Sequence, residues 1–202
     1  MKIGIEGVSC TGKTTLAFAL AARLGHTSLV PCYYHAAPDA SALPDPDASS
    51  EDEQLDALVV HLEIELLRQH RAQAAVERGC HVVLDRTVDT LLAHLRAIGE
   101  MKNLDANARA RSLVAERVDC GQAVVPDVTL LLHADDDVLS ERASARIAMP
   151  GIYYDPRFAQ AFHTHFLDPI TPKLLRLDAS RPADDVLERA VDALGPYVAV
   201  LR

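Results

Sequence analysis

Residues 7–14 read GVSCTGKT and so match the pattern GxxxxGK(S/T). A short apolar-rich stretch at 2–6 precedes them, and an amphipathic stretch at 13–24 follows and ends before a glycine. A strand, a glycine-rich loop and a helix in this order are the context in which the pattern forms a phosphate-binding loop (P-loop). We therefore expect the loop N–H groups and the helix start to surround phosphates, with Lys13 reaching the β- and γ-phosphates and Thr14 ligating Mg²⁺.

The rest of the chain continues the alternation of strands and helices. Strands joined by helical crossovers form right-handed units with a parallel sheet, so the pattern predicts a doubly wound, five-stranded parallel α/β fold. Glycine and proline mark the expected ends of several helices. The expected strands cover 2–6, 27–33, 81–84, 128–132 and 174–177, and the expected helices cover 13–24, 50–79, 87–99, 105–121, 136–147, 156–167 and 180–194.

Composition limits the classes to which the chain can belong. Its 202 residues are 49% hydrophobic and 24% charged, which fits a single globular domain, 1–202. Twenty Lys and Arg against 29 Asp and Glu give a net charge of -9, the wrong sign for binding nucleic acid or an anionic membrane. No apolar run reaches the roughly 18 residues of a membrane span, and the four cysteines form no CxxC pair. We expect a cytoplasmic protein with reduced thiols.

A second charged element follows the strand at 81–84. Asp85 and Arg86 emerge at its carboxyl end, where ligands of open α/β sheets bind. Asp85 can hold the Mg²⁺ shell or accept a proton, and Arg86 can bind an anionic group. A mechanical ATPase usually has a second carboxylate where Arg86 stands, and the chain has no N-K-x-D guanine-reading motif. These residues favour a kinase over a hydrolase or a switch.

A third element lies after the fourth expected strand. Asp135 begins a helix that carries Arg142 and Arg146, and a spacing of four residues places both guanidinium groups on one helix face. The break at Met149-Pro150-Gly151 is a possible hinge. We expect a lid at about 142–156 that brings these arginines to the charge that develops during phosphoryl transfer.

The acidic stretch and four of the tyrosines each have two interpretations. The stretch 38–56 holds seven acidic residues and no basic one, which fits either a solvated surface loop, about 36–52, or a loop that faces the substrate. The tyrosines can stack on a base or fill the core: Tyr33, Tyr34, Tyr153 and Tyr154.

Taken together, these motifs resemble the thymidylate kinase family of P-loop nucleoside and nucleoside monophosphate kinases. The likeness runs collinearly over nearly the whole chain. The elements that carry it are Glu6-Gly7 with Thr11-Gly12-Lys13-Thr14-Thr15, the helix end 71–79 with the strand 82–84 and Asp85-Arg86, the strand 126–130 with Glu141-Arg142 and Arg146, the run 155–158, and the last strand at 177–182.

The resemblance implies a role for each matching position. It implies an ATP- and Mg²⁺-dependent small-molecule kinase. Kinases of this family are often homodimers, and the helix at 52–78 offers an apolar face for such an interface. The nucleotide-binding positions would be Gly7, Val8, Ser9, Cys10, Thr11, Gly12, Lys13, Thr14, Thr15 and Ser180; the metal positions Thr14 and Asp85; and the catalytic positions Lys13, Asp85, Arg86, Arg142 and Arg146.

Departures from the family pattern leave the acceptor open. The family supplies an arginine after its second strand for the phosphate of the acceptor, but no Lys or Arg lies between Arg23 and Arg68. Thr87 replaces an aromatic residue, and Ser9 a frequently acidic one. A hydroxyl acceptor needs a general base rather than cations, whereas a nucleoside monophosphate needs cations, which Arg86 and Arg96 can supply. The alternative function is a nucleotide-binding regulatory or assembly module without kinase turnover.

Overall fold

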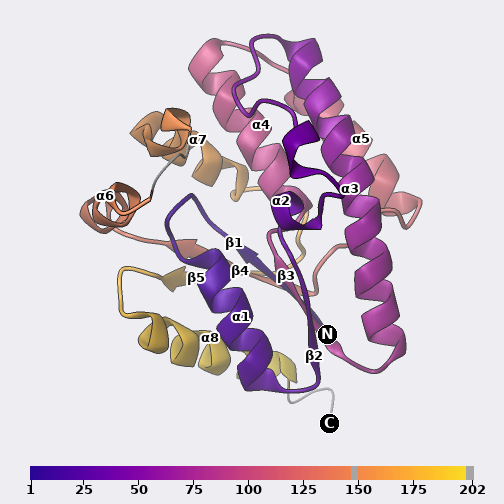
Figure 1. Ribbon diagram of the computed structural model, residues 1–202, viewed down its shortest axis with the longest axis vertical. Helices are drawn as coiled ribbons and strands as arrows, with labels where there is room; N and C mark the ends of the chain where they lie inside the picture. Colours follow the sequence, from indigo (N-terminus) through magenta and orange to yellow (C-terminus); the bar gives the residue numbers. More distant parts are fainter. Residues whose placement is uncertain (147–149, 199–202) are drawn as a thin grey trace.

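The computed structural model describes residues 1–146 and 150–198 and contains one five-stranded sheet in the order β2-β3-β1-β4-β5 (Figure 1). Every neighbouring pair of strands is parallel, which confirms the predicted fold class. The strands are β1 Lys2–Glu6, β2 Thr27–Val30, β3 His81–Asp85, β4 Val128–His133 and β5 Leu174–Asp178.

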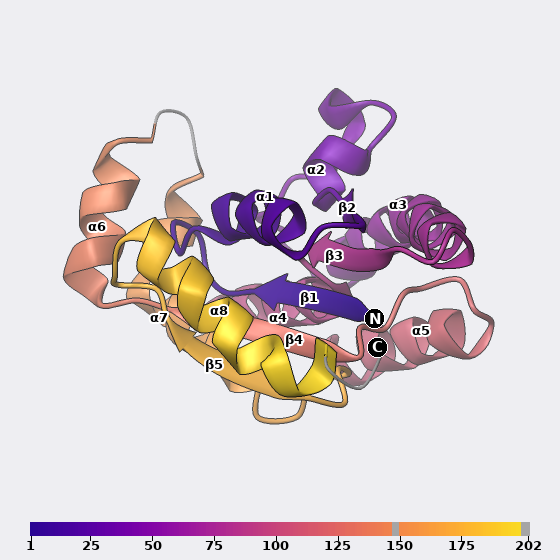
Figure 2. The same cartoon turned by 90° about the horizontal axis from the view of Figure 1, so that it is seen from below.

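Helices cover both faces of the sheet, so the molecule has three layers (Figure 2). Helices α1 and α8 pack on one face, and α3, α4, α5 and α7 lie on the other. The helices are α1 Lys13–Leu24, α2 Tyr33–Ala36, α3 Glu51–Glu77, α4 Val88–Lys102, α5 Asn107–Asp119, α6 Asp136–Ser144, α7 Pro156–His165 and α8 Ala183–Val198, with 3-10 turns at Ala40–Ala42 and Gly151–Tyr154.

Central strands have apolar side chains on both faces, as a sheet covered by helices requires. On β3, Val83 packs in the cluster with α1 and α8, while Val82 and Leu84 pack with α3. Where β1 meets α4 the sheet needs a small residue. A Cβ on Gly4 would lie 2.6 Å from side-chain atoms of both Thr129 and Thr87.

Several predicted ends are wrong. Strand β2 stops at Val30, because Pro31 has no N–H to continue the ladder, and the chain turns into α2. Gly99 does not stop its helix; α4 continues to Lys102 and ends at Asn103, which takes the left-handed conformation (φ 57°). A Cβ on Gly99 would lie 2.7 Å from the carbonyl oxygen of Leu104, so this glycine allows the turn to pack back on the helix.

Two further helix ends differ. Helix α8 runs through Gly195 and Pro196 instead of stopping before them, since one missing N–H in a last turn is tolerated. Helix α6 ends at Ser144, short of the predicted Ile147. Ile147 of that prediction, and Met149 of the hinge, lie outside the described residues.

Helix α3 buries only part of its apolar surface. Leu58 and Leu62 are buried, but Val59 and Leu67 are exposed. Its start is as predicted, since Ser50 accepts a hydrogen bond from the N–H of Glu53. The pairing of two copies through this helix stays a prediction.

Among the described residues, no helix is both long and apolar enough to cross a membrane.

Candidate functional site

The loop between β1 and α1 is folded by two glycines that no other residue can replace without strain. Gly7 has φ 143°, and a Cβ there would lie 2.6 Å from the carbonyl oxygen of Leu132. Gly12 has φ 89° and is the N-cap of α1. Thr11 closes the loop by donating its hydroxyl proton to the carbonyl oxygen of Val8, at 2.8 Å. The backbone therefore curls at the amino end of α1 as a P-loop requires.

Lys13 is held against this loop. Its side chain is buried, and its Nζ donates to the carbonyl oxygen of Val8 at 2.6 Å. Burial, with a contribution from the positive charge of Arg86, lowers the pKa of Lys13 to about 7, although Glu6 and Asp85 act in the opposite direction. The ammonium group thus lies in a poorly hydrated position where an anion would strongly favour its charged form.

Thr14 and Asp85 meet across the start of α1 and the end of β3. The hydroxyl of Thr14 donates to Oδ2 of Asp85 at 2.7 Å. The other oxygen of this carboxylate, Oδ1, is buried and has no hydrogen-bond partner among the described residues. Mg²⁺ takes hydroxyl and carboxylate oxygens as ligands, together with water and substrate phosphates. These two residues fit a Mg²⁺ site that phosphates complete.

Arg86 follows Asp85 in a strained conformation. Its φ is 72°, which is uncommon for a residue with a side chain and is often found at ligand sites. Its N–H donates to the carbonyl oxygen of Ile5, and its own carbonyl accepts from Nη2 of Arg68 at 2.6 Å. The strain is therefore balanced by contacts from β1 and α3.

Arg68 is a residue that sequence reasoning missed. Its side chain is fully buried and pairs with Glu65 at 2.5 Å. The guanidinium also donates to the carbonyl oxygens of Pro31, Asp85 and Arg86, which fixes the ends of β2 and β3 together. A usable signal was present, because both charged residues lie at the helical spacing of the buried face of α3.

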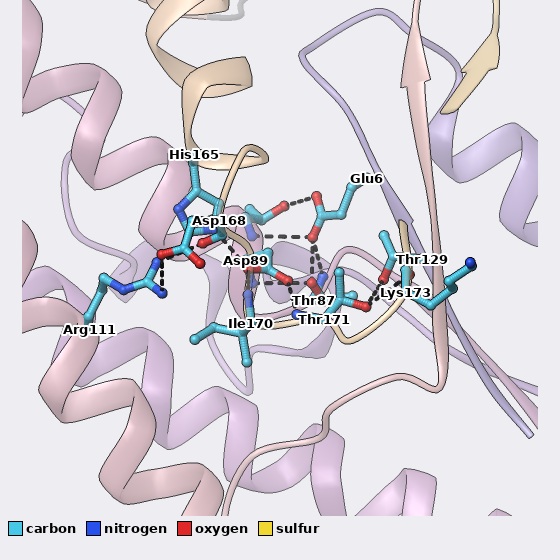
Figure 3. Close-up of polar contacts among 11 residues, drawn as sticks. Glu6, Thr87, Asp89, Arg111, Thr129, His165, Asp168, Ile170, Thr171 and Lys173 are labelled. Carbon is cyan, nitrogen blue, oxygen red and sulfur yellow. Dashed lines mark hydrogen bonds and ion pairs between the residues drawn. The ribbon is translucent and has the colours of Figure 1, made fainter. Parts of the chain in front are cut away.

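Two buried carboxylates hold α4 in place (Figure 3). Glu6, at the end of β1, accepts hydrogen bonds from the N–H and hydroxyl groups of both Thr87 and Thr90, and burial raises its pKa. Asp89 accepts from Nε2 of His165 at 2.8 Å and from the N–H of Thr171 at 3.0 Å. Helix α7 and the segment that precedes β5 are thereby attached to α4.

The P-loop separates two cavities. The smaller cavity, of 370 Å³, lies between the carboxyl-side half of the loop, α1 and the turn between β5 and α8. Arg142 and Arg146 both line it, although Arg146 lies two residues beyond the end of α6 rather than on the same helix. Nη1 of Arg142 lies 3.4 Å from the carbonyl oxygen of Cys10. Thr11 and Gly12 of the loop and Thr15 of α1 also line it.

Ser180 lies next to residues that line this cavity but is not among its described lining residues. Its hydroxyl oxygen accepts from the N–H of Asp135 at 2.9 Å, which joins the turns after β4 and β5. The residues of its turn that line the smaller cavity are its neighbours Ala179, Arg181 and Ala183.

The larger cavity, of 590 Å³, lies on the other side of the loop and has aromatic walls. Gly7, Val8 and Ser9 form its floor next to Arg86. The ring-bearing residues that line it come from four helices and a 3-10 turn: Tyr33, Tyr34, His61, His94, Tyr153, Phe158 and Phe162. Tyr33, Tyr34 and Tyr153 thus lie at this cavity, while Tyr154 is not among its described lining residues.

The acidic stretch contributes apolar atoms to this cavity. Its lining residues are Ala40, Leu43, Pro44 and Pro46, and none of its seven carboxylates is among the described lining residues. Several of those carboxylates are engaged elsewhere, as in the ion pair of Asp47 with Lys102 at 2.7 Å. The stretch lines one part of the cavity with apolar side chains, and its carboxylates are not among the described lining residues.

Comparisons with known proteins rest on structure alone. No protein-family model matches the sequence, and no curated protein matches it. Deoxyadenosine kinase from M. mycoides, solved with bound dATP, superposes with a TM-score of 0.70 at 14% identity, over 96% of this chain and 100% of that chain. Thymidylate kinase from Candida albicans superposes with a TM-score of 0.72 at 18% identity, over 97% of this chain and 91% of that chain.

This is the fold of a thymidylate kinase-like nucleotide kinase. A second structure of the M. mycoides enzyme, with dCMP and dCDP bound, has a TM-score of 0.66 at 13% identity over 97% of this chain. The three-layer arrangement thus persists where little of the sequence does.

Proposed function

We propose that this protein is an ATP- and Mg²⁺-dependent kinase that phosphorylates a nucleoside, a nucleoside monophosphate or a related hydroxylated small molecule. The observation that carries the proposal is that the P-loop lies between two cavities, with Lys13 and the Thr14–Asp85 pair beside it and Arg86 in the larger cavity. A donor and an acceptor can approach the loop from opposite sides. The neighbours of the same fold are a deoxyadenosine kinase and a thymidylate kinase, which supports this reading.

In this proposal the smaller cavity receives the adenosine part of ATP, and the larger cavity receives the acceptor. An acceptor oxygen, which is a hydroxyl oxygen on a nucleoside and a phosphate oxygen on a monophosphate, forms a bond to the γ-phosphorus. The bond from that phosphorus to the bridging oxygen breaks, and ADP leaves with the electron pair. A hydroxyl acceptor also releases one proton to solvent. Mg²⁺, when bound at Thr14 and Asp85, supplies charge neutralisation to the phosphates.

The chain's own residues act by position and charge. The N–H groups of the loop and Lys13 bind the phosphates, and Arg142 and Arg146 reach them from the lid side. Arg86 faces the acceptor. Glu6 and Arg68 position Thr87 and Arg86 through buried hydrogen bonds.

The test is ATP consumption with Mg²⁺ over a panel of nucleosides and nucleoside monophosphates, followed by mass spectrometry of the products. We expect one acceptor class to gain a mass of one phosphate while ATP becomes ADP. Tight ATP binding without transfer to any acceptor would favour the regulatory or assembly module instead, and would leave the aromatic cavity without a use.

A further inference from the structure

The larger cavity carries very little charge. Arg86 is the only side chain with a formal charge among the described residues that line it. Arg96, which sequence reasoning offered as a second cation for an acceptor phosphate, pairs with Glu100 at 2.8 Å and does not line the cavity. Arg68 is fully buried against Glu65. A monophosphate dianion would therefore meet a single guanidinium, which favours an acceptor without its own phosphate.

Rings from two separate parts of the chain line the cavity. Tyr33 and Tyr34 come from α2, while Tyr153 and Phe158 come from the 3-10 turn before α7 and from α7 itself. Phe158 contacts Tyr153 edge-on, with ring centroids 5.4 Å apart. A planar ring system is the ligand shape that gains most from such walls, because offset and edge-on ring contacts add to the burial of apolar area.

His61 presents one fixed polar atom in this apolar surface. Its Nδ1 lies 2.7 Å from the carbonyl oxygen of Ala57, and since a carbonyl only accepts, Nδ1 carries the proton. Burial lowers the pKa of His61, so the ring is neutral near pH 7. Nε2 then bears a lone pair, and no described residue donates a hydrogen bond to it.

His94 differs from His61 in this respect. Burial lowers the pKa of His94 to about 4, so this ring is also neutral. Its Nε2 is already within 3.4 Å of the hydroxyl of Tyr153. Of the two histidines in the cavity, His61 is the one whose Nε2 has no hydrogen-bond partner among the described residues.

On the premise that the protein is the kinase proposed above, we propose that its acceptor is an uncharged, hydroxyl-bearing molecule with a planar ring system. We further propose that His61 is a specificity residue whose Nε2 accepts a hydrogen bond from an N–H or O–H of that molecule. A site that accepts such a bond discriminates against analogues that lack the donor, because the buried acceptor is then left unpaired.

The test measures binding without ATP, by titration calorimetry. The probes are thymidine, deoxycytidine, deoxyadenosine and deoxyguanosine, each beside its 5′-monophosphate. We expect at least one nucleoside to bind, and its monophosphate to bind at least about tenfold more weakly. His61→Phe keeps a ring against Tyr33 but removes the acceptor, and should weaken that nucleoside about tenfold.

Two further variants separate recognition from folding. His61→Gln keeps an acceptor oxygen near the position of Nε2 and should restore part of the lost affinity. His70→Phe, on the exposed side of the same helix, should leave the affinity unchanged. Thermal unfolding of each variant reports whether the fold is kept.

Three results would overturn the inference: tighter binding of a monophosphate, an unchanged affinity in His61→Phe, or no binding of any of the eight probes. ATP binding is measured separately in the same protein. It distinguishes a wrong inference about the acceptor from a wrong proposal of kinase function. A protein that binds ATP and phosphorylates a monophosphate retains the function and refutes the inference. A protein that neither binds nor consumes ATP refutes the function itself.

Discussion

The two cavities on either side of the P-loop are built in different ways. The smaller one is lined by the carboxyl-side half of the loop, by Arg142 and Arg146, and by the turn after β5 with the start of α8. Three arginines, Arg142, Arg146 and Arg181, stand against one carboxylate, Asp184, so its described lining has a net positive charge. The larger one is lined mostly by rings and apolar residues that lie between positions 32 and 162, with one charged side chain. A phosphate site can be encoded in one short motif because it uses backbone N–H groups. A cavity for the body of a small molecule needs surfaces from several elements, so its character follows from packing.

The buried Arg68–Glu65 pair lies behind the larger cavity, and the largest effect on stability is expected when it is broken. Arg68→Met leaves the Glu65 carboxylate buried without its partner, and also removes donors from three carbonyl groups. We expect the free energy of unfolding to fall by about 3–5 kcal/mol, measured by urea denaturation.

Arg109→Met is the matched control for this variant. Arg109 pairs with Glu51 at the exposed surface, so its loss should cost less than about 1 kcal/mol. Equal effects of the two substitutions would contradict the supporting role of the buried pair.

The loop side is tested by Lys13→Ala. Loss of the cation at the phosphates should lower kcat/KM by about 10²–10³-fold, while binding of the acceptor in the larger cavity should change by less than about twofold. Steady-state kinetics and calorimetry with the acceptor measure the two quantities. Lys102→Ala, which removes a cation that pairs with Asp47 away from the loop, serves as the control. Full activity in Lys13→Ala would refute the mechanism.

The charge state of Lys13 in the P-loop can be tested by measuring ATP affinity as a function of pH. The pKa of Lys13 is about 7, so above pH 7 the free protein has a neutral Lys13 and must take up a proton to present a cation to ATP. Since the phosphates are ionised above about pH 6, ATP affinity should fall as pH rises from 7 to 9, by up to about tenfold per unit. Calorimetry in two buffers at pH 8 should show uptake of close to one proton per ATP.

Lys13→Arg is the control for the pH series. Its guanidinium stays charged over this range, so its ATP affinity should be nearly independent of pH. A flat profile in the unmodified protein would place the pKa of Lys13 well above 7.

The smallest effect is expected in the acidic stretch. Combining Asp39→Asn, Asp45→Asn and Asp52→Asn removes three charges and keeps the local hydrogen bonds that an Asn side chain can also accept. Because no carboxylate of the stretch lines the larger cavity within the described residues, activity should stay within about twofold. A loss of 100-fold or more would locate a general base in this stretch after all.

Much of the fold could be predicted from local pattern. The bounds of β1 and α1 agree with prediction to the residue, because the strand, the glycine loop and the helix follow one another within a single motif. The ends that were wrong depend on how the chain turns at each of them. Gly99 lies inside α4, where the carbonyl oxygen of Leu104 packs back against it, and Tyr33 belongs to α2 because the strand cannot continue through Pro31.

The candidate site also has features that follow from local sequence and features that follow from tertiary packing. The P-loop, the Asp85-Arg86 pair at a strand end and the two arginines after the fourth strand follow from the sequence, because each is a short pattern with its own chemistry. Three other features follow from packing: Arg68 is buried behind Arg86, Arg96 pairs with Glu100 and does not line the cavity, and His61 lines it among tyrosines. Burial, the ring nitrogen left free on a histidine and the charge of a cavity depend on neighbours far apart in the chain, and those neighbours exist only once the sheet and its helices have packed.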